Sequence, residues 1–137
     1  MNKKVLLAVA SMLLSGSAFA GVVVIGNPAT GDALNAKQAE ALYLGKSKSL
    51  PGGMQATIME LPDGNPMRQE FHSKVTGKSE SQLKSYWSRL VFTGKATAPS
   101  EQGSTAAMKA AVAATPGAVG YIDESEVDAS VTVLFKP

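Results

Sequence analysis

A strand, a tight turn and a helix follow one another within residues 56–77, and this unit constrains the fold more than any other stretch of the chain. The apolar run at its start is typical of a buried strand, and Asp63-Gly64 is a favourable pair for a tight turn. Asn65 is a good N-cap, and Pro66 suits the first position of a helix. The residues therefore predict a helix that begins directly after a strand.

The start of this helix is a candidate anion-binding site. Unpaired backbone N–H groups and the positive end of the helix dipole meet there. Arg68 lies in the same first turn, so an anion would find N–H groups and a guanidinium together. The candidate ligand-binding residues are Asp63, Gly64, Asn65, Met67 and Arg68. The alternative interpretation is that Asn65 only caps the helix and Arg68 is a solvated surface charge.

Strands and helices alternate along the rest of the chain. Ser79 and Gln82 match a capping box and predict a helix over residues 80–92 with an apolar stripe. The stripe includes Trp87, whose ring could face a ligand but whose spacing favours the core. Gly120 inside a predicted strand indicates a close backbone approach or a bulge. The other predicted elements are strands at 21–26, 118–122 and 130–135, helices at 36–44 and 104–115, and a polar loop at 93–103. This order predicts one α/β domain, a mostly parallel sheet flanked by helices.

Residues 1–20 match a secretory signal peptide. Two lysines are followed by a ten-residue apolar run that is too short to span a membrane, and Ala18-Phe19-Ala20 fits the cleavage pattern. We expect cleavage before Gly21, export to a periplasm, and a mature domain over residues 21–137 that is not embedded in the membrane.

Several functional classes are disfavoured by the residues that remain. Without Lys3 and Lys4, eleven basic residues face eleven acidic ones, which argues against nucleic acid as a partner. The chain has no cysteine and a single histidine, His72, which fits a surface or core position better than a metal site. No nucleophile–base pair stands out, so we expect neither an enzyme nor a bound cofactor or metal.

Five segments taken together resemble a known family. Their order is similar to that in the type 2 periplasmic solute-binding proteins of phosphate ABC transporters, and in particular to a short, single-lobe group among them. The segments are Val22-Val-Val-Ile-Gly-Asn-Pro28, Ala41-Leu-Tyr-Leu-Gly-Lys46, Arg68-Gln-Glu-Phe71, Tyr86-Trp-Ser-Arg-Leu-Val-Phe-Thr-Gly-Lys95 and Pro116-Gly-Ala-Val-Gly-Tyr-Ile122.

The resemblance implies a periplasmic-binding-protein-like lobe, with the anion held by a turn of the Asp-Gly-Ser-Gly-Thr kind at a helix N-terminus. Here Asp63 and Gly64 match that turn, whereas Asn65, Pro66 and Met67 replace its Ser, Gly and Thr. One N–H donor and one hydroxyl are lost, and we infer that the Arg68 guanidinium could compensate. The chain is also less than half the length of a full member, which leaves half of a cleft.

Two functional hypotheses follow from the sequence. In the first, the protein is an exported solute-binding module for phosphate or a similar oxyanion, linked to ABC-type uptake, and a transporter's membrane component is a candidate partner. In the second, the lobe fold is kept but ligand binding is lost, and the protein is a periplasmic interaction module that contacts another protein or itself.

Overall fold

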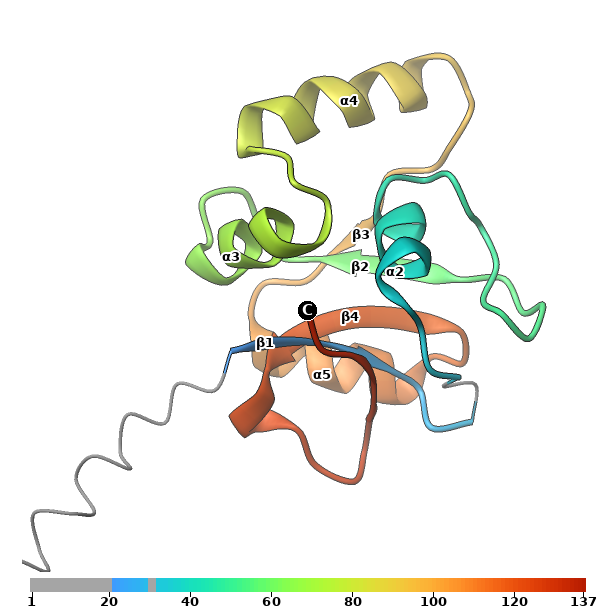
Figure 1. Ribbon diagram of the computed structural model, residues 1–137, viewed down its shortest axis with the longest axis vertical. Helices are drawn as coiled ribbons and strands as arrows, with labels where there is room; N and C mark the ends of the chain where they lie inside the picture. The colour runs from blue at the N-terminus through green and yellow to red at the C-terminus, as the bar shows by residue number, and fades with distance from the viewer. Residues whose placement is uncertain (1–20, 30–31) are drawn as a thin grey trace, which may run out of the picture.

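The chain folds around a five-stranded sheet with helices on both faces (Figure 1). The computed structural model describes residues 21–29 and 32–137, so the expected signal peptide lies outside the described residues. The strands lie in the order β3-β2-β4-β1-β5. They are β1 Val22–Gly26, β2 Thr57–Glu60, β3 Ser100–Glu101, β4 Ala118–Asp123 and β5 Thr132–Phe135.

One strand runs against the other four. β1 is antiparallel to both of its neighbours, β4 and β5, whereas β2 is parallel to β3 and β4. The two central strands, β1 and β4, are buried along their whole length, as expected for strands covered on both faces. The prediction of an α/β domain with a sheet flanked by helices is confirmed, but the sheet is mixed, since two of its four strand pairings are antiparallel.

The residues of β4 show how the two faces are covered. A Cβ atom on Gly120 would lie 2.5 Å from the Met108 sulfur of α5 (Thr105–Ala114), so the predicted close approach is confirmed. The next residue, Tyr121, points to the opposite face and stacks on Phe71 of α3 (Pro66–Val75), with 4.0 Å between ring centroids. Helix α2 (Ala36–Tyr43) shares that face, because its Tyr43 meets Phe71 edge to face at 4.7 Å. The aromatic cluster lies between α2, α3 and the sheet.

The helix starts agree with the predicted caps. The Asn65 side chain accepts the Met67 N–H at 2.8 Å, and Ser79 and Gln82 form the expected capping box at the start of α4 (Glu80–Phe92). A single 3-10 turn, η1 (Glu124–Glu126), joins β4 to the last strand. Strand β3 was missed within the predicted polar loop, because two residues show no alternation to recognise. None of the helices in the described ranges is long and apolar enough to cross a membrane.

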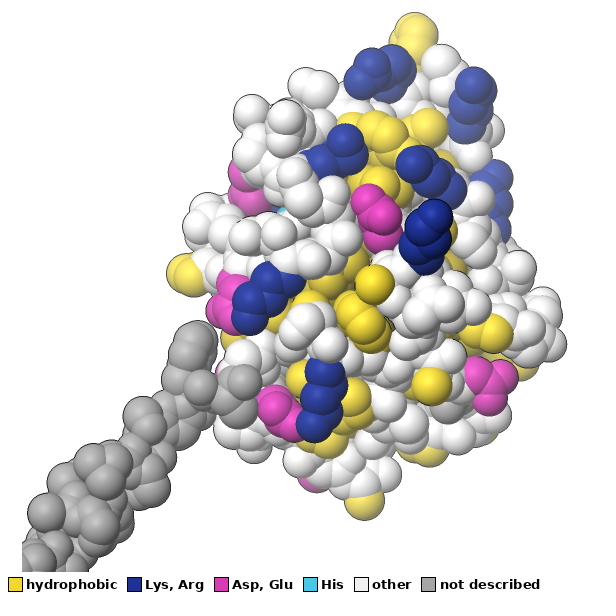
Figure 2. Space-filling view, viewed as in Figure 1, with side chains coloured by type: hydrophobic (Ala, Val, Ile, Leu, Met, Phe, Trp, Pro, Cys, Tyr) yellow, Lys and Arg dark blue, Asp and Glu magenta, His cyan; other side chains and the backbone are white. Residues whose placement is uncertain are grey.

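Helix α4 stands apart from the layers that form the core (Figure 1). Of its apolar stripe only Leu83 is buried, while Trp87 is half-buried. At the end of the helix Val91 is 45% exposed and Phe92 is 92% exposed. Figure 2 shows an apolar patch with basic side chains around it over this end of the molecule. The prediction that Trp87 is a core residue was wrong, because an amphipathic stripe indicates a face to be covered and not the element that covers it.

Candidate functional site

The turn between β2 and α3 has the local structure that its residues predict. The Asn65 N–H donates to the Pro62 carbonyl at 3.2 Å, which closes the turn. Gly64 adopts a φ of +84°, a conformation that suits glycine, and Pro66 is the first residue of α3. The Asn65 side chain is occupied by its cap hydrogen bond. The five predicted site residues therefore lie together, but the side-chain amide of Asn65 caps α3 and does not face a ligand.

Arg68 is folded beneath this turn, with only 11% of its side chain exposed. Its Nη1 donates to the Leu61 carbonyl at 2.8 Å. Its Nη2 lies 3.3 Å from the Asp63 carboxylate, and its Nη1 lies 3.7 Å from the Glu60 carboxylate. The interpretation of Arg68 as a solvated surface charge is wrong, because its guanidinium is held against the end of β2.

The Glu80 carboxylate occupies the position where the sequence predicted an external anion. Glu80 is the first residue of α4, and its Oε2 accepts the Gly64 N–H. Its Oε1 lies 3.5 Å from the Arg68 Nε, an atom that is buried and has no hydrogen-bond partner among the described residues. A backbone N–H and a guanidinium thus converge on one pair of anionic oxygens, as the candidate site requires.

The other two predicted residues contribute less directly. Asp63 is half-exposed and pairs with Arg68 and, at 3.7 Å, with Lys84. The Met67 side chain packs against the hydrophobic core, and its backbone N–H is taken by the Asn65 side chain. The groups that face an anion are therefore the Gly64 N–H and the Arg68 guanidinium, with Asp63 as a competing negative charge.

A buried polar network under the site was missed by the sequence analysis. Glu60, the last residue of β2, is 4% exposed and accepts the hydroxyl proton of Tyr121. His72 is buried, which is the core position of the two that the sequence allowed. Its Nε2 lies 2.6 Å from the Glu60 carboxylate, and its Nδ1 lies 3.0 Å from the Thr76 hydroxyl. The one sequence feature that could have indicated this network is a charged residue, Glu60, at the end of an otherwise apolar strand.

This network links β2, α3 and β4 through hydrogen bonds beside Arg68. Burial raises the pKa of Tyr121 far above its ordinary value, and the Glu60 carboxylate raises it further. Tyr121 therefore remains a hydrogen-bond donor, and its oxygen also accepts the Leu61 N–H at 3.2 Å. Through Glu60 and Leu61, the same network supports both partners that hold Arg68 in place.

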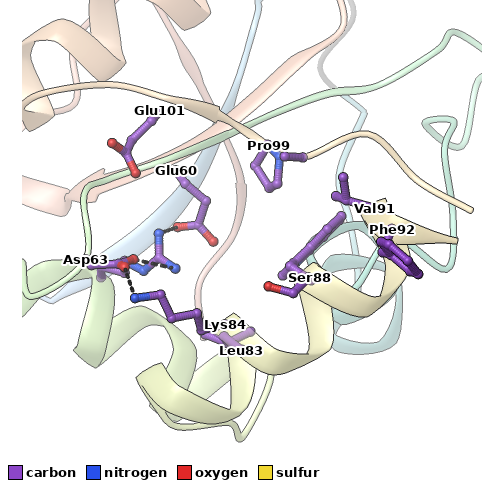
Figure 3. A pocket seen from close by; sticks show the side chains of 12 residues that line it. Glu60, Asp63, Leu83, Lys84, Ser88, Val91, Phe92, Pro99 and Glu101 are labelled. Atoms are coloured by element: carbon purple, nitrogen blue, oxygen red, sulfur yellow. Dashed lines mark ion pairs between the residues drawn. The ribbon is translucent and has the colours of Figure 1, made fainter. Parts of the chain in front are cut away.

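A cleft of about 500 Å³ opens between this turn and α4 (Figure 3). Glu60 reaches it from β2, Leu83 and Ser88 from α4, and Pro99 from the segment before β3. Trp87 also lines the cleft, and its indole N–H is buried without a hydrogen-bond partner among the described residues. The cleft has charged groups at the turn and an apolar wall along α4, so an anion at Arg68 would lie at its charged end.

Comparisons with known proteins assign the fold. An ABC-type phosphate transport receptor from Vibrio cholerae aligns with 83% of this chain at a TM-score of 0.65 and 20% sequence identity. A putative phosphate ABC transporter substrate-binding protein with bound phosphate, from Clostridium perfringens, aligns with 83% of the chain at a TM-score of 0.64 and 25% identity. No protein-family model matches the chain, and no curated protein matches it either.

The aligned region covers only 45% and 44% of those two structures, so this chain spans less than half of their length. These values fit a short, single-lobe form of the periplasmic-binding-protein-like fold. The resemblance predicted from the sequence segments is confirmed at the level of the fold.

Proposed function

We propose that this protein is exported to the periplasm and binds phosphate or a similar oxyanion at the turn between β2 and α3, in support of ABC-type phosphate uptake. It is a binding protein and not an enzyme in this proposal. The observation that carries it is the convergence of the Gly64 N–H and the Arg68 guanidinium on the Glu80 carboxylate. Carboxylate and phosphate oxygens suit the same donors, so in this proposal the external anion takes the place of the Glu80 carboxylate.

The fold supports the same proposal. Both structural neighbours are named as phosphate transport proteins, and one of them was determined with phosphate bound. The ligand of this chain is our inference from that fold together with the geometry at the turn.

The contacts at the turn also predict weak binding. Arg68 already faces three carboxylates, those of Glu60, Asp63 and Glu80. A phosphate ion has to displace Glu80 and share Arg68 with the other two. Asp63 and Glu80 are partly exposed to water, so salt screens these interactions and competes with the ligand.

Calorimetric titration of phosphate into the protein, purified free of phosphate and at low salt, tests the proposal. We expect saturable heat from the wild-type protein, none from Arg68→Ala, and unchanged heat from the control Lys37→Ala, which alters an exposed cation outside the site. Sulfate serves as the comparison anion.

A second variant guards against a folding defect, because Arg68→Ala also removes the hydrogen bond to Leu61. Glu80→Gln removes the competing charge and leaves Arg68 in place. We expect it to bind phosphate about fivefold more tightly, the effect of one modest charge-assisted contact. Absence of binding in both the wild-type protein and Glu80→Gln would contradict the proposal.

A second candidate function is favoured by a different observation. Val91 and Phe92 are exposed at the end of α4, where a partner could cover them. In this alternative the lobe fold is kept, Glu80 permanently fills the anion site, and the protein acts as a periplasmic interaction or accessory module. The titration of the wild-type protein separates the two functions, since the alternative predicts no phosphate binding while the Glu80 carboxylate fills the site.

A further inference from the structure

Charge is unevenly distributed along the described chain, although its total is balanced. Residues 78–100, which include α4, carry four basic side chains and one acidic one. Residues 102–137 carry two basic side chains and four acidic ones, and Glu101 between the two ranges lines the cleft beside α4. Figure 1 places α4 at one end of the molecule and the connection between β4 and β5 at the other. The protein therefore has a basic end at α4 and an acidic end near η1.

On and beside α4, Lys84 pairs with Asp63, whereas most of the other basic side chains have no carboxylate partner. Six basic side chains of the described residues form no ion pair, namely Lys37, Lys46, Lys48, Lys78, Arg89 and Lys95. All except Lys37 lie on α4 or beside it. Gly45 packs against Trp87 and Leu90, which brings the segment containing Lys46 to the helix. These five charges are free to meet an external anionic partner.

An exposed aromatic side chain lies among these charges. Phe92 is 92% exposed, and it lines a shallow groove along α4 with Lys84, Ser88 and Arg89. Phe92, Lys84 and Ser88 also line the cleft at the β2–α3 turn. Figure 2 shows basic side chains around the apolar patch at this end of the molecule, with an acidic side chain at its lower edge. Aromatic side chains beside lysine and arginine are characteristic of segments that lie in a membrane interface.

We propose that α4 docks this protein onto an anionic membrane surface, with Phe92 in the headgroup region and the surrounding basic side chains facing lipid phosphates. The proposal is independent of phosphate binding at the β2–α3 turn. It assigns a partner to the apolar residues that the core leaves uncovered.

The arrangement of the charges favours an extended surface over a small ligand. The five unpaired cations are spread along α4 and the segments beside it, and they do not converge on one point as the groups at Arg68 do. A negatively charged plane attracts the basic end and repels the acidic end, so it also orients the molecule. Pairing of α4 with α4 of a second copy would instead bring Lys84 and Arg89 close to like charges, which is unfavourable.

Sedimentation with lipid vesicles tests the proposal. The purified protein is mixed with phosphatidylcholine vesicles that contain or lack phosphatidylglycerol, and residues 1–20 are kept the same in every variant so that their contribution cancels. We expect binding to the vesicles with phosphatidylglycerol, and release by added salt.

Two variants and one matched control locate the binding face. Arg89→Glu should weaken binding about thirtyfold, because each basic charge near such a surface contributes about fivefold and the change reverses one charge. Phe92→Ser should weaken it about tenfold through loss of apolar burial. Lys37→Glu reverses an unpaired charge away from α4 and should bind within about twofold of wild type.

Each other result would overturn the proposal. Equal binding to both kinds of vesicle would remove the role of lipid charge, and equal losses from Arg89→Glu and Lys37→Glu would remove the role of α4. Self-association that Arg89→Glu abolishes, without any vesicle binding, would assign this face to a second copy of the chain. Capture of an acidic protein without vesicle binding would assign it to a protein partner.

Discussion

Helices α3 and α4 follow one another in the chain, and both begin at a side-chain N-cap, yet they lie in different surroundings. Helix α3 buries Phe71 and His72 against the sheet, where Phe71 stacks on Tyr121. Helix α4 buries only Leu83 and leaves Phe92 in water. A helix's own pattern thus predicts which of its faces is apolar, whereas burial of that face depends on a partner elsewhere in the molecule.

The two helices meet at the candidate site. Arg68 comes from the first turn of α3, and Glu80 is the first residue of α4. The site therefore joins a rigid, well-packed region to a loosely packed one. In the proposed function, Arg68 on the well-packed helix α3 donates to the ligand. The loosely packed helix α4 supplies the Glu80 carboxylate, which the ligand displaces.

The largest expected difference is between two phenylalanines. Phe71→Ala should lower the free energy of unfolding by about 3–5 kcal/mol, because it removes a fully buried ring. Phe92→Ala should change it by less than about 0.5 kcal/mol, because the ring is exposed. Urea unfolding measures both. Similar losses from the two substitutions would mean that α4 is packed in solution.

The next prediction compares two carboxylates that are register partners on neighbouring strands, Glu60 of β2 and Glu101 of β3. Glu60→Ala should cost about 3 kcal/mol, because Tyr121, His72 and Arg68 lose their shared partner. Glu101→Ala, at an exposed position without an ion pair, should change stability by less than about 0.5 kcal/mol. A small effect of Glu60→Ala would show that the buried network does not support the site.

The two N-caps should affect different properties. Asn65→Ala should lower the global free energy of unfolding by about 1 kcal/mol, because α3 unfolds together with the core. Ser79→Ala should leave global stability nearly unchanged and should speed amide hydrogen exchange within α4, which opens locally. Hydrogen exchange followed residue by residue measures the second effect. Equal protection of the α3 and α4 amides from hydrogen exchange would contradict the claim that α4 opens locally.

The smallest expected effect is a dependence of the free energy of unfolding on pH, which arises from Asp123 in the sheet and not from α4. Hydrogen bonds from the Ser125 hydroxyl, and also from the N–H groups of Ser125 and Gly21, lower the pKa of Asp123. A lowered pKa in the folded protein contributes stability above the unfolded value of about 4, and that contribution is lost as the pH falls through the folded value.

Unfolding measured across this pH range tests the effect. We expect Asp123→Asn to lower stability at neutral pH and to flatten the decrease at acid pH, whereas the exposed Glu101→Gln should follow the wild-type curve. Parallel curves for Asp123→Asn and the wild-type protein would contradict this assignment.

Local signals accounted for most of the fold. The caps at Asn65 and Ser79, the close approach at Gly120 and the order of strands and helices all depend on residues near one another in the sequence. Strand β3 was missed because its two residues carry no pattern of their own.

The candidate site was only half predictable. The turn from Asp63 to Arg68 is continuous in sequence, and its cap and tight turn follow from residue type. The position of Glu80 depends on how α4 returns over the turn, and the Glu60 network depends on Tyr121, which is 61 residues away. Such contacts are set by tertiary packing, so residue spacing gave no indication of them.

The most direct test of the account follows the Gly64 amide by NMR during titration with phosphate. We expect a saturable shift of the Gly64 amide resonance as phosphate replaces the Glu80 carboxylate. The midpoint concentration of phosphate should be lower in Glu80→Gln. Sodium chloride at matched ionic strength should cause no shift. A Gly64 amide that does not move in either protein, while the protein is folded and phosphate is in excess, would contradict the claim that this turn binds an oxyanion.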